Sequence, residues 1–289
     1  MSTAVPIPLW LLLIAGALAL LGLFDRILTP SLRWVLQRRA NRAIEELNTR
    51  LKLKIRPFKM TTRRILIDRL AHDPEVLKAA EAHAKAEGMP LSVASEMVQK
   101  YAAEIVPAFS AYTYFKVGAK LARWLSTALY RVRLGYLNAD ALEKIDPEAA
   151  VIFVMNHRSN MDYILVTYMA SSQTALSYAV GEWARIPVLQ TLIRSMGAYF
   201  IRRGDRGQLY RKVLARYVQM STEAGVTQAI FPDGGLSRDG LMRPVKLGLI
   251  SYILDGWKPE SRDVVFVPVG LNYDRVLEDR SLVAEIGGP

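Results

Sequence analysis

The 289-residue chain contains no cysteine. This absence excludes disulfide bonds, thiolate metal ligands and cysteine nucleophiles, and it leaves the redox compartment undetermined. Histidine is almost as scarce, with single residues at positions 72, 83 and 157. A metal site built from several histidines is therefore not expected. His72 and His83 fall in polar helical stretches, where we interpret them as structural or solvated side chains.

Charge is absent from the first 24 residues. Residues 5–24 are almost wholly apolar, with Trp10 near one end and Phe24 at the other. A helix of this length, at about 1.5 Å rise per residue, spans roughly 30 Å, the thickness of the hydrocarbon core of a bilayer. A cleaved signal peptide is the alternative, but it would carry positive side chains before the apolar run, and none is present. We therefore predict an uncleaved transmembrane anchor over residues 1–25.

The formal net charge of +11 is concentrated directly after this run. Residues 26–67 contain twelve Lys and Arg, opposed by Glu45 and Glu46 alone, and form a basic juxtamembrane segment. By the positive-inside rule, we expect a single-pass protein of the cell (inner) membrane whose remaining chain is cytoplasmic. Anionic phospholipid is the expected partner. Nucleic acid is not expected as a partner, because the basic segment adjoins the apolar span, and a solvated helix face stays open for part of it.

Residues 68–140 form a predicted helical accessory region. Asp73-Pro74-Glu75 is typical of a helix start, and that helix should end near Gly88. Ser92 is expected to cap a second helix, which stops near Pro107. Residues 111–136 mix aromatic and basic side chains, which suits a bilayer interface or a helix packed on the next domain, and the residues leave both open.

Residues 141–289 alternate strand and helix patterns. The expected strands are 151–155, 175–180, 198–203, 227–231 and 264–269, and the expected helices are 161–169, 183–196, 208–223 and 246–255. Strands separated by helices imply crossover connections. The predicted fold class is therefore α/β, with a largely parallel or mixed sheet flanked by helices. Ligands of such sheets bind beyond the carboxyl ends of the strands.

The stretch VIFVMNHRSNMDY at 151–163 places His157 in a turn between a buried strand and a helix, with Asp162 five residues later. On one continuous helix the two side chains would point apart. If His157 lies in the turn and Asp162 in the first helical turn, the carboxylate can reach the imidazole and fix its tautomer. A histidine held in this way can take a proton from a hydroxyl. The competing interpretation is a capping histidine with an aspartate that favours the helix N-terminus.

Two further stretches after strands suit a phosphate. Arg202 and Arg203 follow one strand, and a Gly-rich turn at 232–240 with Arg238 and Lys246 follows another. Arginine forks and glycine amides are favourable phosphate ligands. A solvated strand end and an ordinary loop are the alternatives. Together with His157 and Asp162, these residues indicate a base acting on the hydroxyl of a phosphorylated alcohol.

Four stretches, in order, resemble the motifs of the glycerolipid acyltransferases. NHRSNMD at 156–162 looks like their His-x4-Asp motif, and GAYFIRR at 197–203 resembles the second motif in its glycerol-3-phosphate form. FPDGGLSR at 231–238 resembles the third motif, and VPVG at 267–270 stands at the fourth. Two residues depart from the pattern, since Asp233 replaces a usual Glu and Leu236 a frequent Arg. The chain ends at Pro289, soon after the fourth motif, which suggests a short or C-terminally shortened member.

The resemblance implies acyl transfer from an acyl thioester, either acyl-CoA or an acyl carrier protein, to the sn-1 hydroxyl of glycerol 3-phosphate. It assigns His157 as general base and Asp162 as its orienting residue. It implies no metal and no redox cofactor. The implied acceptor-phosphate ligands are Arg202, Arg203, Ser237, Arg238 and Lys246, and the implied oxyanion and third-motif residues are Asp233, Gly234 and Gly235. Lysophosphatidate or dihydroxyacetone phosphate as acceptor, or a non-catalytic membrane-anchored lipid-binding protein, are the alternatives.

Overall fold

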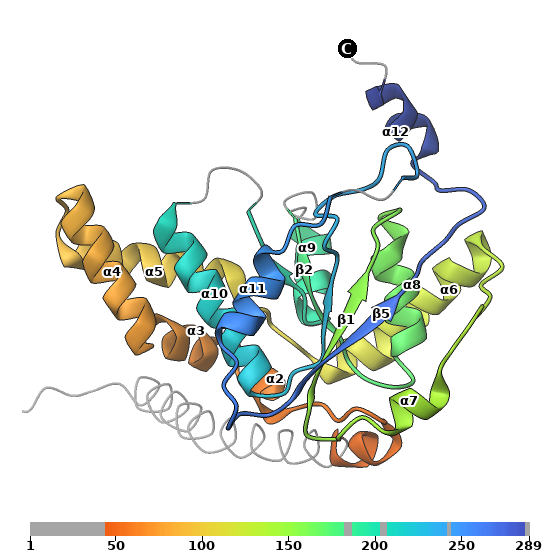
Figure 1. Cartoon of the computed structure of the whole chain (residues 1–289), viewed down its shortest axis with the longest axis horizontal. Helices are drawn as coiled ribbons and strands as arrows, with labels where there is room; N and C mark the ends of the chain where they lie inside the picture. Colours follow the sequence, from red (N-terminus) through yellow and green to blue (C-terminus); the bar gives the residue numbers. More distant parts are fainter. Residues whose placement is uncertain (1–43, 182–186, 203–206, 242–243, 287–289) are drawn as a thin grey trace, which may run out of the picture. The chain divides into compact units, whose positions relative to one another are not determined.

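The computed structural model describes residues 44–181, 187–202, 207–241 and 244–286 (Figure 1). The chain divides into two compact units, Met1–Arg50 and Leu51–Pro289. In the first unit, residues 44–50 are helical and Arg50 pairs with Glu46 at 2.9 Å. The predicted anchor and most of the basic segment lie outside the described residues. Within the part of the chain that the structure describes, no helix combines the length and apolarity needed to cross a bilayer.

The second unit is built on a five-stranded sheet in the order β3-β2-β4-β1-β5. The strands are β1 Ala150–Met155, β2 Ser177–Val180, β3 Tyr199–Phe200, β4 Gln228–Ile230 and β5 Val264–Val269. Every pairing is parallel; Ile152 of β1, for example, is opposite Gln228 of β4 and Phe266 of β5. The predicted α/β class with a parallel sheet is confirmed. β1 lies between β4 and β5, so its carboxyl end is bordered by two neighbouring loops.

Helices connect the successive strands, as parallel pairing requires. The connecting helices are α8 Met161–Ala170, α9 Pro187–Ser195, α10 Gln208–Glu223 and α11 Gly248–Asp255, and α12 Asp279–Ile286 follows β5. The prediction for α10 matches its observed bounds. The strand predicted over 198–203 was too long, because β3 is an edge strand in which only Tyr199 and Phe200 are paired with β2.

Alternation along the strands divides the core between the two faces of the sheet. On β1, Ile152 packs in a cluster with α3, α4, α5 and α10, whereas Met155 packs in a second cluster with α8. Tyr199 and Phe200 of β3 divide in the same way. The sheet is thus covered on both faces, which explains its almost continuously apolar strands.

The helices before β1 pack mainly against α10 of the α/β part. They are α2 Pro57–Met60, α3 Arg63–Ala71, α4 Pro74–Glu87 and α5 Leu91–Ile105. The predicted start of α4 is confirmed, since the Asp73 side chain accepts a hydrogen bond from the amide of Glu75 at 3.0 Å. The Ser92 cap was wrong. Pro90 is the N-cap residue, with extended backbone and no side-chain cap bond, so the helix already includes Ser92.

Three further helices precede β1: the π-helix η1 Thr113–Gly118, α6 Ala119–Leu129 and α7 Ala139–Glu143. α6 lies beside α8 (Figure 1), and it buries Ala122 and Ser126. Packing on the α/β part therefore holds for one face of this helix. The other face is exposed.

Candidate active site

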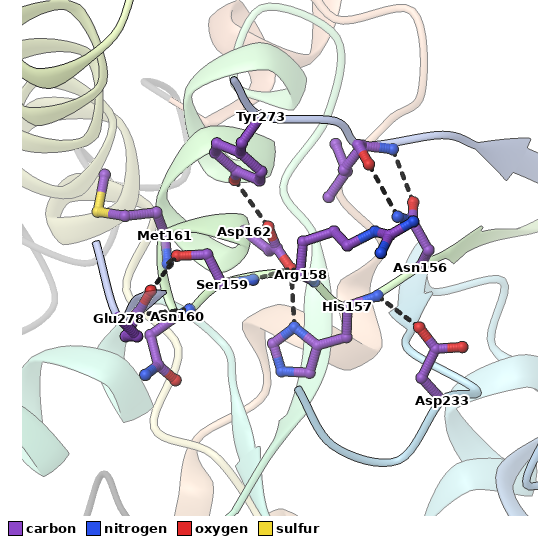
Figure 2. Close-up of polar contacts among 11 residues, drawn as sticks. Asn156, His157, Arg158, Ser159, Asn160, Met161, Asp162, Asp233, Tyr273 and Glu278 are labelled. Carbon is purple, nitrogen blue, oxygen red and sulfur yellow. Dashed lines mark hydrogen bonds and ion pairs between the residues drawn. The ribbon is translucent and has the colours of Figure 1, made fainter. Parts of the chain in front are cut away.

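Three loops meet at the carboxyl ends of neighbouring strands. Residues 156–160 follow β1, residues 231–240 follow β4, and residues 270–278 follow β5. Because parallel strands end at the same edge of a sheet, the order β4-β1-β5 brings these loops together. Figure 2 shows the polar contacts that link them.

His157 and Asp162 form a buried hydrogen-bonded pair. The Nδ1 atom of His157 lies 2.8 Å from Oδ2 of Asp162, and the residues are 2% and 0% exposed. The pair forms because His157 belongs to the turn, whereas Asp162 is the second residue of α8. The N-cap residue is Asn160, which makes no side-chain cap bond, and Ser159 Oγ accepts from the amide of Met161 at 3.0 Å. The imidazole of His157 therefore pairs with Asp162 and does not cap the helix.

The Asp162 carboxylate accepts three further hydrogen bonds. Its Oδ2 atom receives the amides of Arg158 at 2.7 Å and Ser159 at 3.1 Å, and Oδ1 receives the Tyr273 hydroxyl at 2.7 Å. Burial, reinforced by the charge of Asp162, raises the pKa of Tyr273 far above its ordinary value, so the phenol stays protonated and donates. Four donors thus fix the position of this buried carboxylate.

This arrangement determines the histidine tautomer. A carboxylate only accepts, so Nδ1 of His157 carries the proton and Nε2 has a free lone pair in the neutral ring. Figure 2 shows Nε2 directed away from Asp162. A neutral imidazole in this tautomer, with a carboxylate behind it, can accept a proton at Nε2 and hold the resulting imidazolium.

Aromatic rings hold the imidazole from two sides. The ring centroid of Phe231 lies 4.6 Å from that of His157, and the Tyr163 ring meets it edge-on at 5.2 Å. Tyr163 comes from α8 and Phe231 follows β4, so both walls are supplied by elements of the core. The packing restricts ring rotation and excludes water from most of the imidazole.

The loop at 231–240, which contains the third motif and is called the third-motif loop, is hydrogen-bonded to the backbone of His157 in the turn at 156–160, called the histidine turn. The amide of His157 donates to Oδ2 of Asp233 at 2.7 Å, and the amide of Ser237 donates to the carbonyl of His157 at 3.1 Å. Ser237 Oγ donates to the carbonyl of Leu241 at 2.7 Å, inside the same loop. Asp233 thus holds the backbone of His157, and Ser237 closes its own loop.

Residues after β5 complete the turn, and sequence reasoning missed them. Asn156 exchanges two hydrogen bonds with the backbone of Leu271, at 2.8 and 2.7 Å. Glu278 accepts from Ser159 Oγ at 2.8 Å and from the amide of Asn160 at 3.0 Å. The signal that could have found Tyr273 and Glu278 was their place, since polar residues just beyond a parallel strand lie at the same edge of the sheet as His157.

Two basic side chains lie beside the third-motif loop. Gly234 has φ +65°, and a Cβ atom there would stand 2.5 Å from Cδ of Lys246, whose chain passes directly over this glycine. The guanidinium of Arg158, another residue that the sequence analysis did not single out, approaches Gly240. Its Nε atom is buried and has no hydrogen-bond partner among the described residues. Arg238 is exposed on the same loop.

Arg202 lies elsewhere. Its guanidinium pairs with Glu104 of α5, with NH2 at 2.6 Å from Oε2 and Nε at 3.0 Å from Oε1. It follows β3, the edge strand, which is three strands from β1 and so about 14 Å away at ~4.8 Å per strand. The structure therefore brings His157, Asp162, Asp233, Gly234 and Lys246 together but seats Arg202 on α5. Arg203 lies outside the described residues.

Tyr273→Phe is expected to lower kcat about tenfold without unfolding the protein, because Asp162 loses a donor that fixes its position against His157. The variant removes one charge-assisted hydrogen bond to Asp162, a contact of roughly 1.5–3 kcal/mol, and keeps the ring. The remaining carboxylate charge is less dispersed and attracts an imidazolium more strongly, so the acidic limb of the rate profile should move to higher pH. Steady-state kinetics between pH 5 and pH 9 would measure both effects. A lower melting temperature with an unchanged pH profile would mean that Tyr273 only supports the fold.

A family model, a solved structure and curated proteins are similar to this chain. A family model described as "Acyltransferase" matches residues 137–272, the span that contains β1 to β5 and the His157 turn. The resemblance predicted from the four motifs is thereby confirmed. The 1-acyl-sn-glycerophosphate acyltransferase of Thermotoga maritima, a solved structure, is 19% identical, with a TM-score of 0.38 over 61% of this chain and 80% of that one.

Curated relatives are more similar in sequence. The glycerol-3-phosphate acyltransferase of Pseudomonas putida is 32% identical over 231 residues, and that of Xylella fastidiosa is 32% identical over 236 residues. These alignments cover 78% and 79% of this chain but 28% and 27% of the relatives. The chain therefore spans little more than a quarter of the length of the proteins that it matches.

Proposed function

We propose that this chain, whose residues 137–272 belong to the acyltransferase family, transfers a fatty acyl group to the sn-1 hydroxyl of glycerol 3-phosphate. The donor is an acyl thioester, either acyl-CoA or an acyl carrier protein, and the product is lysophosphatidate. One observation carries the proposal: His157 is held by the buried Asp162 in the tautomer that leaves Nε2 free. The names of the Pseudomonas and Xylella relatives support the choice of acceptor.

The proposed reaction begins at Nε2 of His157. This nitrogen takes the proton of the acceptor hydroxyl as the oxygen forms a bond to the thioester carbonyl carbon. The negative charge of Asp162 stabilises the imidazolium that results. When the tetrahedral intermediate collapses, the carbon–sulfur bond breaks and the thiolate takes the proton from the imidazolium. The ester and a free thiol are released, and His157 returns to its starting state without any metal or redox cofactor.

A backbone amide of the third motif is the proposed oxyanion donor. The amide of Gly234 already donates to the carbonyl of Phe231 at 3.1 Å, within the turn. The amide of Gly235 makes no hydrogen bond among the described residues, so we assign the role to this neighbour. An amide already fixed in a turn needs no reorganisation when charge develops on the carbonyl oxygen.

The acceptor phosphate is proposed to bind Lys246 and Arg158, with Arg238 at the exposed side of the loop. Lys246 lies over Gly234, and the buried Nε of Arg158 still has a donor to give. Arg203 and Ser237 stay candidates, whereas Arg202 would first have to leave Glu104. Leu236 supplies no charge at a position where relatives often carry arginine, which gives Arg158 and Lys246 a larger share of the binding.

Lys246→Met is expected to raise the KM for glycerol 3-phosphate about 10- to 30-fold, with little change in the KM for the thioester. The substitution removes one charge-assisted contact to the phosphate but keeps the aliphatic stem over Gly234. Lys246→Arg should restore part of the affinity. Arg202→Met serves as the matched control, since loss of its pair with Glu104 should lower the melting temperature and leave the KM values near wild type. Equal effects of Lys246→Met on both substrates would remove Lys246 from the phosphate site.

Membrane attachment through residues 1–25 belongs to the same proposal, with the catalytic part on the cytoplasmic side of the inner membrane. The charge-free run at 5–24 and the basic segment after it support this topology. Extraction separates it from peripheral binding, because an anchored chain resists high salt and alkaline washing and needs detergent. Release by salt alone would count against the anchor.

The deciding experiment is an acyl-transfer assay on the detergent-solubilised full chain. A labelled long-chain acyl-CoA and the corresponding acyl carrier protein would be offered with glycerol 3-phosphate, dihydroxyacetone phosphate or lysophosphatidate. We expect product chiefly from glycerol 3-phosphate. Product only from another acceptor would retain the mechanism and change the substrate. Binding of lipid without any product would support a non-catalytic lipid-binding protein instead.

A further inference from the structure

The outer face of η1 and α6 carries an unusual set of exposed apolar side chains. Val117, Leu121 and Trp124 are 44%, 40% and 62% exposed, although they follow one another at helical spacing. Exposed apolar side chains continue at Leu129, the last residue of α6, and after the helix at Leu134, Tyr136 and Leu137. A row of exposed apolar side chains on one helix indicates a partner rather than ordinary solvent contact.

Another side of the same helix is already packed against the fold. Its small and aromatic residues pack toward the core at intervals of three or four positions, and they are Ala111, Tyr114, Gly118, Ala122 and Ser126. The α6 part of this face lies against α8, and η1 contacts α9. The exposed apolar row is therefore on a second face of the helix, separate from the buried face that packs against the rest of the fold.

A basic row runs directly beside the apolar one. Lys116, Lys120 and Arg123 are all exposed, each one position before an apolar residue of the row. Arg131 and Arg133 continue this charge, and residues 111–137 contain no Asp or Glu. Lysine is depleted from protein–protein interfaces, whereas lysine and arginine stems beside tryptophan and leucine suit the boundary between headgroups and acyl chains.

We propose that this face of η1 and α6, which we call the docking face, lies on the surface of an anionic phospholipid bilayer. Val117, Leu121 and Trp124 would enter the headgroup region, and Lys116, Lys120 and Arg123 would contact lipid phosphates. The contact is distinct from the predicted anchor at residues 1–25. It also adjoins the candidate active site, because Tyr130, at the end of α6, meets the ring of Tyr273 at 5.2 Å, and Tyr273 donates to Asp162.

The absence of cysteine allows a direct test. In the full chain, Leu121→Cys would carry the only thiol, which is labelled with an environment-sensitive fluorophore. Leu77→Cys on α4 is the matched control, since Leu77 is exposed to a similar extent, 39% against 40%. Both labelled proteins are reconstituted in vesicles of phosphatidylcholine with or without phosphatidylglycerol, with a quencher attached to the lipid chains.

We expect lipid-borne quenching at position 121 to exceed that at position 77 several-fold, and to increase with phosphatidylglycerol. Replacing Lys116, Lys120 and Arg123 by glutamine should remove the dependence on anionic lipid. Equal quenching at the two positions would overturn the proposal. Shielding of position 121 from water without lipid-borne quenching in the vesicles would also overturn it and would identify a protein segment as the occupant. The His157→Ala variant should behave like wild type, so docking and catalysis can fail independently.

Discussion

His157→Ala is expected to lower kcat for acyl transfer by about 10³-fold, within the range of 10²–10⁴ for loss of a general base. The variant leaves no side chain to take the proton of the acceptor hydroxyl. In the wild type that group is Nε2 of His157, which is free because Nδ1 is hydrogen-bonded to Asp162. Binding of the acyl thioester should change little. Single-turnover measurement with the labelled thioester and glycerol 3-phosphate gives the chemical step directly.

A second variant separates the loss of the base from damage to the fold. His157→Asn places an amide near the position of Nδ1, where it can still donate to Asp162, but it offers no base. It should be as inactive as the alanine variant and nearer to wild type in melting temperature, since alanine leaves a cavity beside Phe231 and Tyr163. His72→Ala serves as the histidine control with full activity expected. Retained turnover in the asparagine variant would end the general-base assignment.

Asp162→Asn is expected to lower kcat by about 10²- to 10³-fold while the histidine turn keeps its shape. The asparagine oxygen can receive the three donors that now meet at Oδ2, and its amide can face the hydroxyl of Tyr273, which is able to accept. The histidine tautomer is then retained, but the negative charge that stabilises the imidazolium is lost. In a buried site this charge is worth several kcal/mol.

The pH dependence of kcat distinguishes Asp162→Asn from Tyr273→Phe. Without the carboxylate an imidazolium is less stable, so the acidic limb of the rate profile should move to lower pH. The Tyr273→Phe variant should move it in the opposite direction, because it concentrates the charge that Asp162 retains. If the acidic limb moved in the same direction in Asp162→Asn and in Tyr273→Phe, the assignment of Asp162 as the counter-ion of His157 would be contradicted. Circular dichroism of the two variants controls for unfolding.

The fold could be predicted largely from local pattern. Five strand segments and the helices between them are visible in the alternation of apolar runs and amphipathic stretches, and α10 was predicted with its observed bounds. The predicted ends of elements were wrong where a contact with residues outside the segment sets the end. The strand after Gly197 is short because its neighbour β2 pairs with only two of its residues. The helix predicted from residue 246 begins at Gly248, since the amide of Lys246 donates to the carbonyl of Pro232 at 2.7 Å.

The candidate site divides in the same way. His157 and Asp162 are close in sequence, and a strand, a turn and a helix start are enough to bring them together. The sequence by itself therefore determined the pairing of His157 with Asp162 and the class of sheet that carries them, because these depend on short-range geometry and on the order of apolar segments. It also excluded a cysteine nucleophile, because the chain contains no cysteine.

The tertiary structure alone decided which distant residues surround that pair. The strand order β3-β2-β4-β1-β5 places the loops after β4 and β5 beside His157, and it places β3, which Arg202 follows, three strands away. For this reason Asp233 and Tyr273 contact the histidine turn, whereas Arg202, which the motif pattern grouped with them, pairs with Glu104. Strand order depends on how whole helices pack on the two faces of the sheet, and no local stretch of residues encodes it.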